Sequence, residues 1–237
     1  MNNYLILLTS IILLSSLYVV DVFAASSTQS NELTKFQNWA DDHDIKLQGT
    51  NKKTNQLYYN GWIESRDSVD WKSVPNNMNV YVALSKLPDD VLKVAKGQTL
   101  YLSNQNGRSY TVLGSWPSNH ILANMNKGII LEQPISIQTV THEFGHVVDF
   151  NAIQCNYECS LTNYNTMKTQ RMIIFATPQS GYISSYAKTN TNENFAENFA
   201  FYVNQPSTYQ TKLLQDPTLK NEYNFLKNII FSGKVYS

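Results

Sequence analysis

The chain contains few charged residues and has almost no net charge. Lys, Arg, Asp and Glu make up 15% of its 237 residues, with 18 basic and 18 acidic side chains. This balance gives no electrostatic reason to expect nucleic acid or an anionic membrane as a partner. Asn, Gln, Ser, Thr and Tyr supply much of the polarity instead, which suits an extracellular protein. The sequence also lacks internal repeats and low-complexity tracts.

Cysteine is scarce as well, with only Cys155 and Cys159 in the chain. In an oxidising compartment, a disulfide that closes this small loop is the simplest interpretation. The four-residue spacing demands a tight geometry, so free thiols remain an alternative. Zinc ligation is another, although two cysteines so close together would need two further ligands.

Long apolar runs are absent except at the start of the chain. Residues 1–24 are nearly all apolar up to Val20 and end in Val22-Phe23-Ala24, where small residues suit a signal peptidase. We therefore predict a signal peptide and a secreted, monomeric protein that begins at Ala25 and does not stay on the membrane. The segment has no Lys or Arg before Leu5, and an uncleaved membrane anchor is the alternative. Removal of the segment leaves 237 − 24 = 213 residues with a charge of 18 − 17 = +1.

The order of the predicted elements indicates an α+β domain over residues 25–237. Residues 25–134 are predicted to be rich in strands, and residues 135–237 to be helical. The helical part follows from apolar residues at steps of three and four. Beyond a helix of about four turns that carries residues 141–150, we expect helices over 31–43, 88–95, 166–175, 191–203 and 217–231. The expected strands are the runs KLQG, QLYYNGW, NVYVALS, TLYLS, YTVLGSW and GIILEQ.

The stretch THEFGHVVDF, residues 141–150, carries the strongest chemical signal. His142 and His146 lie about one helical turn apart, so both imidazoles can converge on one metal ion. Glu143 lies about 100 degrees round the helix from His142, which suits a general base beside the metal. An H-E-x-x-H match is expected by chance only about 0.002 times in such a chain. The alternative is a helix whose histidines cap a neighbour and pack in the core.

A catalytic zinc site needs a third protein ligand. The metzincin arrangement is excluded because Asp149 and Ala152 stand where it requires glycine and histidine. Asp149 is better explained as a hydrogen-bond partner than as a ligand. Glu193 and Glu197 lie one turn apart on the helix predicted over 191–203. Glu193 can complete the site, and Glu197 can accept a hydrogen bond from the far nitrogen of a ligand histidine.

A solvated helix face is the alternative explanation for these two carboxylates. Ala196 and Ala200 share that face, however, and phenylalanines flank it, so the helix is predicted to be partly buried there. A buried pair of carboxylates is costly without a metal or another cation. His43 and His120 are given no role.

HEFGH together with SYAKTNTNENFAENF closely resembles the catalytic region of the anthrax lethal factor-like zinc metallopeptidases, which include secreted Pro-Pro endopeptidases. The resemblance implies a zincin-like fold with a cleft between its strand-rich and helical parts. It also implies one zinc ion bound by His142, His146 and Glu193. Glu143 would be the general base, and Tyr186, seven residues before Glu193, would aid catalysis.

The resemblance extends to NGW at 60–62, to DWKSVPN at 70–76 and downstream through FAFYVNQ. It makes Trp71 a candidate wall of the substrate site, while a core aromatic is the other interpretation. The chain departs from the Pro-Pro endopeptidases at Asn192, where they carry an acidic residue.

The sequence therefore predicts a secreted zinc endopeptidase that cleaves an extracellular protein, with proline-rich sites among the candidate targets. An edge strand over 79–84 is expected to bind the substrate backbone. One alternative is a toxin-like protease that acts on host proteins, although such toxins need delivery parts that we do not expect in the 213 residues. The other is a secreted binding module that keeps zinc for structure.

Overall fold

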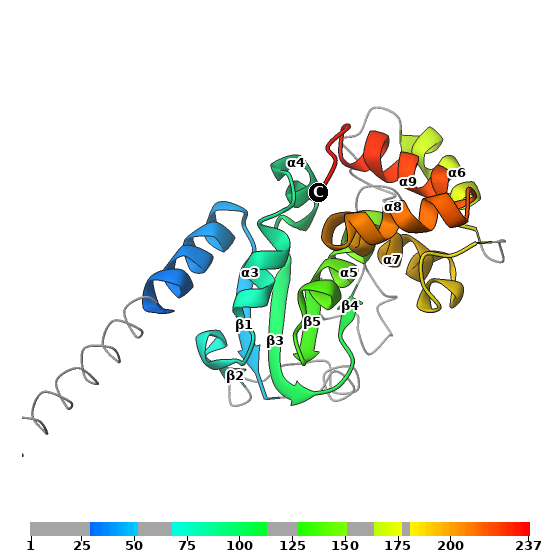
Figure 1. The fold of residues 1–237 in the computed structure, drawn as a ribbon. Coiled ribbons are helices and arrows are strands. Elements are labelled where there is room, and N and C mark those ends of the chain that lie inside the picture. Colours follow the sequence, from blue (N-terminus) through cyan, green and yellow to red (C-terminus); the bar gives the residue numbers. More distant parts are fainter. Residues whose placement is uncertain (1–28, 52–67, 113–127, 151–163, 177–180) are drawn as a thin grey trace, which may run out of the picture. The chain divides into compact units, whose positions relative to one another are not determined.

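The computed structural model describes residues 29–51, 68–112, 128–150, 164–176 and 181–237 (Figure 1). Residues 1–39 and 40–237 form two separate units. The predicted signal peptide and the predicted disulfide between Cys155 and Cys159 lie outside the described residues. The first predicted helix is present over residues 29–42. Within the described ranges, none of the helices is both long and apolar enough to cross a membrane.

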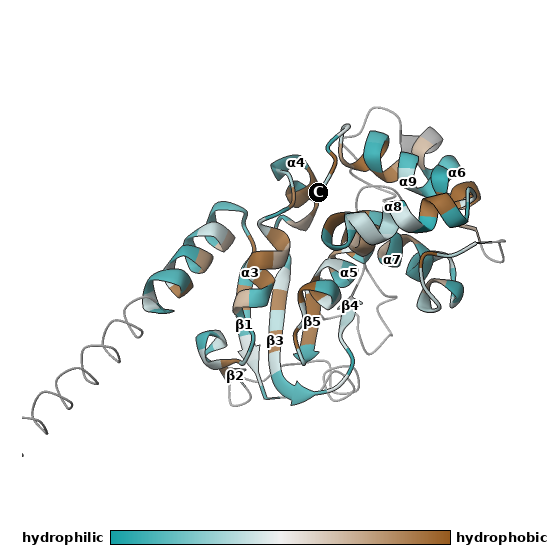
Figure 2. Cartoon of the chain, in the orientation of Figure 1, coloured by the Kyte–Doolittle hydropathy of each residue, from teal (hydrophilic) through white to brown (hydrophobic). Residues whose placement is uncertain are grey.

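The second unit contains a mixed sheet in the order β2-β1-β3-β5-β4. Its central strands β1, β3 and β5 are parallel, and the edge strands β2 and β4 are antiparallel to their neighbours. The apolar runs in β3 and β5 are buried, as expected for central parallel strands (Figure 2). The strands are β1 (Lys46–Thr50), β2 (Ser68–Val69), β3 (Thr99–Asn106), β4 (Tyr110–Val112) and β5 (Gly128–Gln133).

The strand predicted over 79–84 is wrong, because this stretch forms the helix α3 (Met78–Leu84). Alternation in NVYVALS indicates a strand that buries Val80, Val82 and Leu84. The structure instead buries Val80, Ala83 and Leu84 and leaves Val82 40% exposed, which is a helical spacing. Helix α3 lies next to α5 (Ile137–Val148) on one face of the sheet (Figure 1). It therefore offers no edge to a substrate.

The helices predicted after residue 135 are present, and the structure adds one. The unpredicted helix is α8 (Pro206–Gln215), for which Pro206 in the first turn was an available signal. The last helix begins at Leu219 instead of residue 217 and continues as a π-helix over Leu226–Ile230. The others are α4 (Asp89–Leu92, followed by a 3₁₀ turn over Lys93–Ala95), α6 (Tyr164–Ile174), α7 (Thr191–Asn204) and α9 (Leu219–Phe225).

Side-chain caps fix where α5 and α7 begin. The Ser136 hydroxyl accepts a hydrogen bond from the Thr139 amide at the start of α5. The Asn190 side chain accepts from the amides of Asn192 and Glu193 at the start of α7. Each cap satisfies amides that have no partner inside the helix. The caps thereby fix the helical phase of the side chains that follow.

Helices α5 and α7 approach each other closely at Gly145. A Cβ atom at this position would lie 3.1 Å from Cα of Ala196 and 3.3 Å from Cβ of Phe199. Next to this contact, the ring of Phe144 on α5 packs against that of Phe199 on α7, with 6.5 Å between the ring centroids. The short distance between the helices brings the histidines of α5 within reach of the glutamates of α7.

Candidate metal centre

His142 and His146 on α5 and Glu193 on α7 bring three ligand atoms together. Glu193 Oε2 lies 3.0 Å from His142 Nε2 and 3.3 Å from His146 Nε2. The three residues offer ligand atoms that all lie within 4.8 Å of one another. Tetrahedral zinc with bonds of about 2.0–2.1 Å separates its ligand atoms by roughly 3.3 Å. The donor set and its spacing therefore fit a zinc ion.

Glu197 contacts Nδ1, the ring nitrogen of His142 that does not face Glu193. Its Oε1 lies 2.8 Å from His142 Nδ1, and its Oε2 accepts a 2.5 Å hydrogen bond from the Ser184 hydroxyl. A carboxylate on Nδ1 orients the ring and keeps Nε2 for a metal. Ser184 is not predicted from the sequence, because a serine in a loop carries no pattern of its own.

The ionisation of the site reflects these contacts. Burial alone would lower the pKa of His142, but its hydrogen bonds to the carboxylates of Glu193 and Glu197 raise the pKa to about 9. Burial alone would raise the pKa of Glu193, whereas its bonds to His142 and His146 lower the pKa to about 2. At neutral pH without metal, His142 is therefore protonated and Glu193 is ionised. A metal ion that binds Nε2 must displace a proton.

Zinc affinity is therefore expected to increase by about tenfold per pH unit between pH 7 and pH 9, and to level off above that range. The reason is that His142 loses its competing proton only near its pKa of about 9, while Glu193, with a pKa of about 2, stays ionised throughout. Competition with a chelator of known zinc affinity at each pH measures the effect. An affinity that is constant between pH 7 and pH 9 would contradict it.

Glu197→Gln is the matched variant for this experiment. The neutral amide removes one of the carboxylates that raise the pKa of His142. The pH profile should therefore level off at a lower pH, and the plateau affinity should decrease by about 10-fold to 100-fold. A profile identical to that of the parent protein would show that Glu197 does not act on His142.

Glu143 lies beside the three ligands and is held by the edge strand β4. Thr111 Oγ1 lies 2.6 Å from Glu143 Oε2 and 2.8 Å from the Glu143 carbonyl oxygen. Burial raises the pKa of the Glu143 carboxyl, even though His146, Thr111 and His142 lower it. A carboxylate with a raised pKa takes up a proton more readily near neutral pH. No role for Thr111 is predicted from the sequence.

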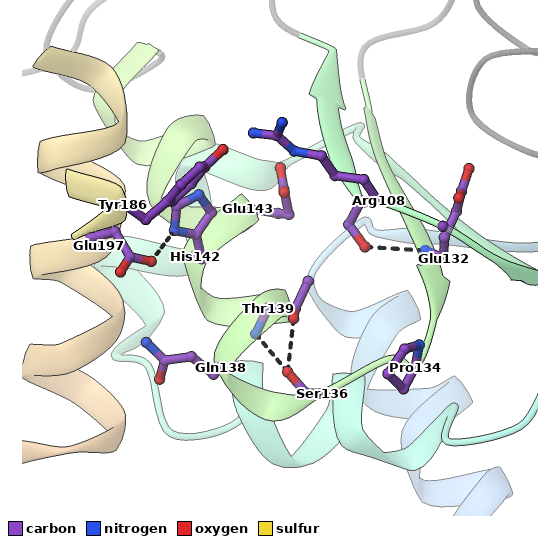
Figure 3. A pocket seen from close by; sticks show the side chains of 12 residues that line it. Arg108, Glu132, Pro134, Ser136, Gln138, Thr139, His142, Glu143, Tyr186 and Glu197 are labelled. Atoms are coloured by element: carbon purple, nitrogen blue, oxygen red, sulfur yellow. Dashed lines mark hydrogen bonds and ion pairs between the residues drawn. The ribbon is translucent and has the colours of Figure 1, made fainter. Parts of the chain in front are cut away.

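His142 and Glu143 face a cavity of about 390 Å³ (Figure 3). Tyr186 lines it as well, from the 3₁₀ turn Tyr186–Lys188, with its ring centroid 5.6 Å from that of His142. The guanidinium carbon of Arg108 lies 5.2 Å from the centroid of the Tyr186 ring. Trp71 is only 7% exposed and is not among the residues that line this cavity, so its place is in the core.

Comparison with known families identifies the class of protein. Residues 95–229, more than half of the chain, match a family described as "putative zinc-binding metallo-peptidase". The chain belongs to this metallopeptidase family. The match spans both helices that carry the three ligand residues. No curated protein matches the chain.

Zinc is accordingly the metal expected at the three ligands of this metallopeptidase. Asp149 is not one of the three ligand residues and instead forms a buried ion pair with Arg171 of α6. His43 is not one of the three ligands, and its Nε2 lies 3.8 Å from Asp89 Oδ1. His120 lies outside the described residues. Arg108 and Arg171 were not singled out from the sequence, since an isolated arginine has no readable spacing.

Proposed function

We propose that the chain is a secreted, zinc-dependent endopeptidase of the lethal factor-like type, with a zincin-like arrangement around its cleft. The observation that carries the proposal is the convergence of His142, His146 and Glu193 beside a buried carboxylate, Glu143, at an open cavity. A structural zinc site has no use for such a carboxylate. Its presence favours an enzyme over a binding module that keeps zinc for structure.

The residues of the chain divide the work of peptide hydrolysis. A zinc ion held by the three ligands would act as a Lewis acid, which polarises the substrate carbonyl and lowers the pKa of water to about 7. The Glu143 carboxylate takes a proton from the attacking water and delivers it to the leaving amine. The Tyr186 hydroxyl donates a hydrogen bond to the negative charge that develops on the carbonyl oxygen. Thr111 orients Glu143 through its hydroxyl.

The substrate backbone is proposed to bind along β4. Within the residues that the structure describes, this strand lies at the edge of the sheet, and Thr111 in its middle contacts Glu143. An extended peptide can add to a free strand edge through backbone hydrogen bonds. β4 thus takes the role that the sequence analysis assigned to residues 79–84.

An extracellular protein is the proposed substrate, with proline-rich segments among the candidate sites. The apolar leader over residues 1–24 supports secretion. The resemblance to secreted Pro-Pro endopeptidases motivates the proline-rich candidates, although Asn192 differs from their acidic residue. A toxin-like protease that acts on host proteins uses the same catalytic groups and is the second candidate.

Cleavage of a randomised peptide library, read by mass spectrometry, tests the proposed function. We expect cleavage that requires about one zinc ion per chain, stops when a chelator removes the metal and returns when zinc is added. Protein with Glu143→Gln, purified in parallel, controls for contaminating proteases. Stoichiometric zinc without cleavage of any peptide would instead support the non-catalytic binding module.

A further inference from the structure

Arg171 of α6 connects the end of α5 to the start of α7. The residue is only 3% exposed. Its Nη2 forms an ion pair with Asp149, lies 2.9 Å from the side-chain oxygen of Asn192 and lies 3.4 Å from the carbonyl oxygen of Thr191. One guanidinium group therefore contacts both helices that carry the proposed zinc ligands.

These contacts lie next to the ligands in the sequence. Asp149 caps the C-terminal end of α5, three residues after His146. Asn192 directly precedes Glu193 in the first turn of α7. A shift of either helix end would therefore move a ligand together with a partner of Arg171.

Arg171 lies in the last turn of its own helix α6, where a positive charge is favourable, but the dipoles of α5 and α7 do not favour the charges placed beside them. The C-terminal end of a helix carries partial negative charge, so Asp149 is unfavourable there. The N-terminal end carries partial positive charge, so the guanidinium of Arg171 is unfavourable beside the first turn of α7. Burial adds a desolvation cost for both groups. The dipole of α6 therefore favours Arg171 on that helix but does not explain why its guanidinium is buried between Asp149 and the first turn of α7, whereas a fixed geometry between α5 and α7 does.

Two other sets of contacts join α5 and α7. Near the start of α5, Asn204 donates a 2.9 Å hydrogen bond to Thr141 Oγ1, and Gln205 Nε2 donates a 3.2 Å bond to Gln138 Oε1. At Gly145 the helices meet through small groups of Ala196 and Phe199, which permit a close approach. Such packing sets the distance between helices but gives few directional constraints on sliding and rotation. Hydrogen bonds to a planar guanidinium are directional, and those of Arg171 supply such constraints at the end where α5 finishes and α7 begins, next to His146 and Glu193.

We infer that Arg171 is a positioning residue of the metal centre, which ties the end of α5 to the start of α7 and so holds Glu193 opposite the two histidines. This inference depends on the zinc site of the proposed function. The polar partners of Arg171 named here are Asp149, Thr191 and Asn192, none of which is a proposed ligand, and Arg171 does not line the cavity. Its effect therefore reaches the metal only through the placement of the helices.

The double variant Arg171→Met, Asp149→Leu tests the inference. It removes both charges together and keeps apolar volume, so neither charge is left buried without the other. Asn192 is exposed, so its side chain can bond water once the guanidinium is gone. We expect the zinc-free protein to unfold within a few degrees of the parent protein. Zinc affinity, measured by chelator competition, should decrease by about 10-fold to 100-fold, and the absorption spectrum of the cobalt(II)-substituted protein should change.

Two further variants serve as a stability control and as a second test of Arg171. Tyr202 lies in the second half of α7, and its hydroxyl donates a 2.5 Å hydrogen bond to the Lys234 carbonyl oxygen. Tyr202→Phe removes this bond and should lower stability without changing zinc affinity. Arg171→Lys keeps the charge but not the planar fork, so zinc affinity should still decrease, although by less. The lysine variant provides the same readout if the double variant does not fold.

The outcomes separate this inference from the proposed function. If the parent protein binds zinc, and the double or lysine variant binds it with parental affinity and a parental cobalt spectrum, the role of Arg171 is overturned and the proposed function stands. If the parent protein itself binds no zinc, both fail. Weaker zinc binding with unchanged zinc-free stability supports a positioning role.

Discussion

Replacing Glu143 with glutamine is expected to lower the rate of peptide cleavage by about 100-fold to 10,000-fold while the protein keeps its zinc. The amide has the size of the carboxyl group and can still accept the hydrogen bond from Thr111. It cannot take up a proton from water. The three proposed ligands do not include Glu143, so metal content should not change. Values of kcat/KM on a cleaved peptide, together with zinc content by emission spectrometry, measure the two effects.

The half-exposed residue Glu32 provides the control for this variant. Glu32→Gln introduces the same chemical change on the helix over 29–42, outside the cavity, and should leave kcat/KM unchanged. If Glu143→Gln retains activity within a few-fold of the parent protein, Glu143 is not the general base. If the variant instead loses zinc, the carboxylate contributes to metal binding and the division of roles is wrong.

Replacing Glu193 with glutamine is expected to weaken zinc binding by about 1,000-fold and to remove most activity at limiting zinc. Structural zinc sites with four ligands bind with about 10–16 kcal/mol, so one ligand accounts for roughly 2.5–4 kcal/mol, and the upper value corresponds to about 1,000-fold. An amide is a much poorer ligand than a carboxylate, and the site then has only two good protein ligands. Chelator competition at pH 8 measures the affinity, and cleavage at increasing zinc concentration measures the recovery of activity.

Glu197→Gln is the matched control for Glu193→Gln, because both residues lie on α7 and contact His142. The loss of zinc affinity should be at least tenfold smaller for Glu197, which contacts only the far side of the imidazole. Equal losses of zinc affinity would show that the roles of Glu193 as a ligand and Glu197 as a partner of His142 have been assigned incorrectly. Unfolding of the zinc-free variants shows whether lost ion pairs with His142 and His146 affect stability as well.

The sequence predicts the two catalytic-region helices well because their local signals agree. Apolar residues at helical spacing define α5, and Asn190 marks the start of α7 as a cap. The stretch over 79–84 fails because Val80 and Leu84 fit both a strand and a helix, and short apolar runs do not distinguish the two. Burial of Ala83 resolves this ambiguity only in the folded protein.

The candidate site is visible in the sequence only where its spacing is local. His142, Glu143 and His146 follow from one helix, and Glu193 from its place on a second helix. The partners of these residues come from distant segments: Thr111 reaches Glu143 from the sheet edge, and Arg171 reaches Asp149 from α6. No periodicity connects such residues, so tertiary structure is needed to find them. Secretion and the extracellular substrate remain predictions.

The contact at Gly145 bears on how related sites can be found by sequence search. The pattern H-E-x-x-H leaves position 145 open to any residue, yet a Cβ there would lie 3.1 Å from the backbone of Ala196. A more selective pattern favours glycine before the second histidine and a small residue three positions after the third ligand. Such a pattern searches for two helices that can approach closely, and so combines a packing requirement with the chemical one.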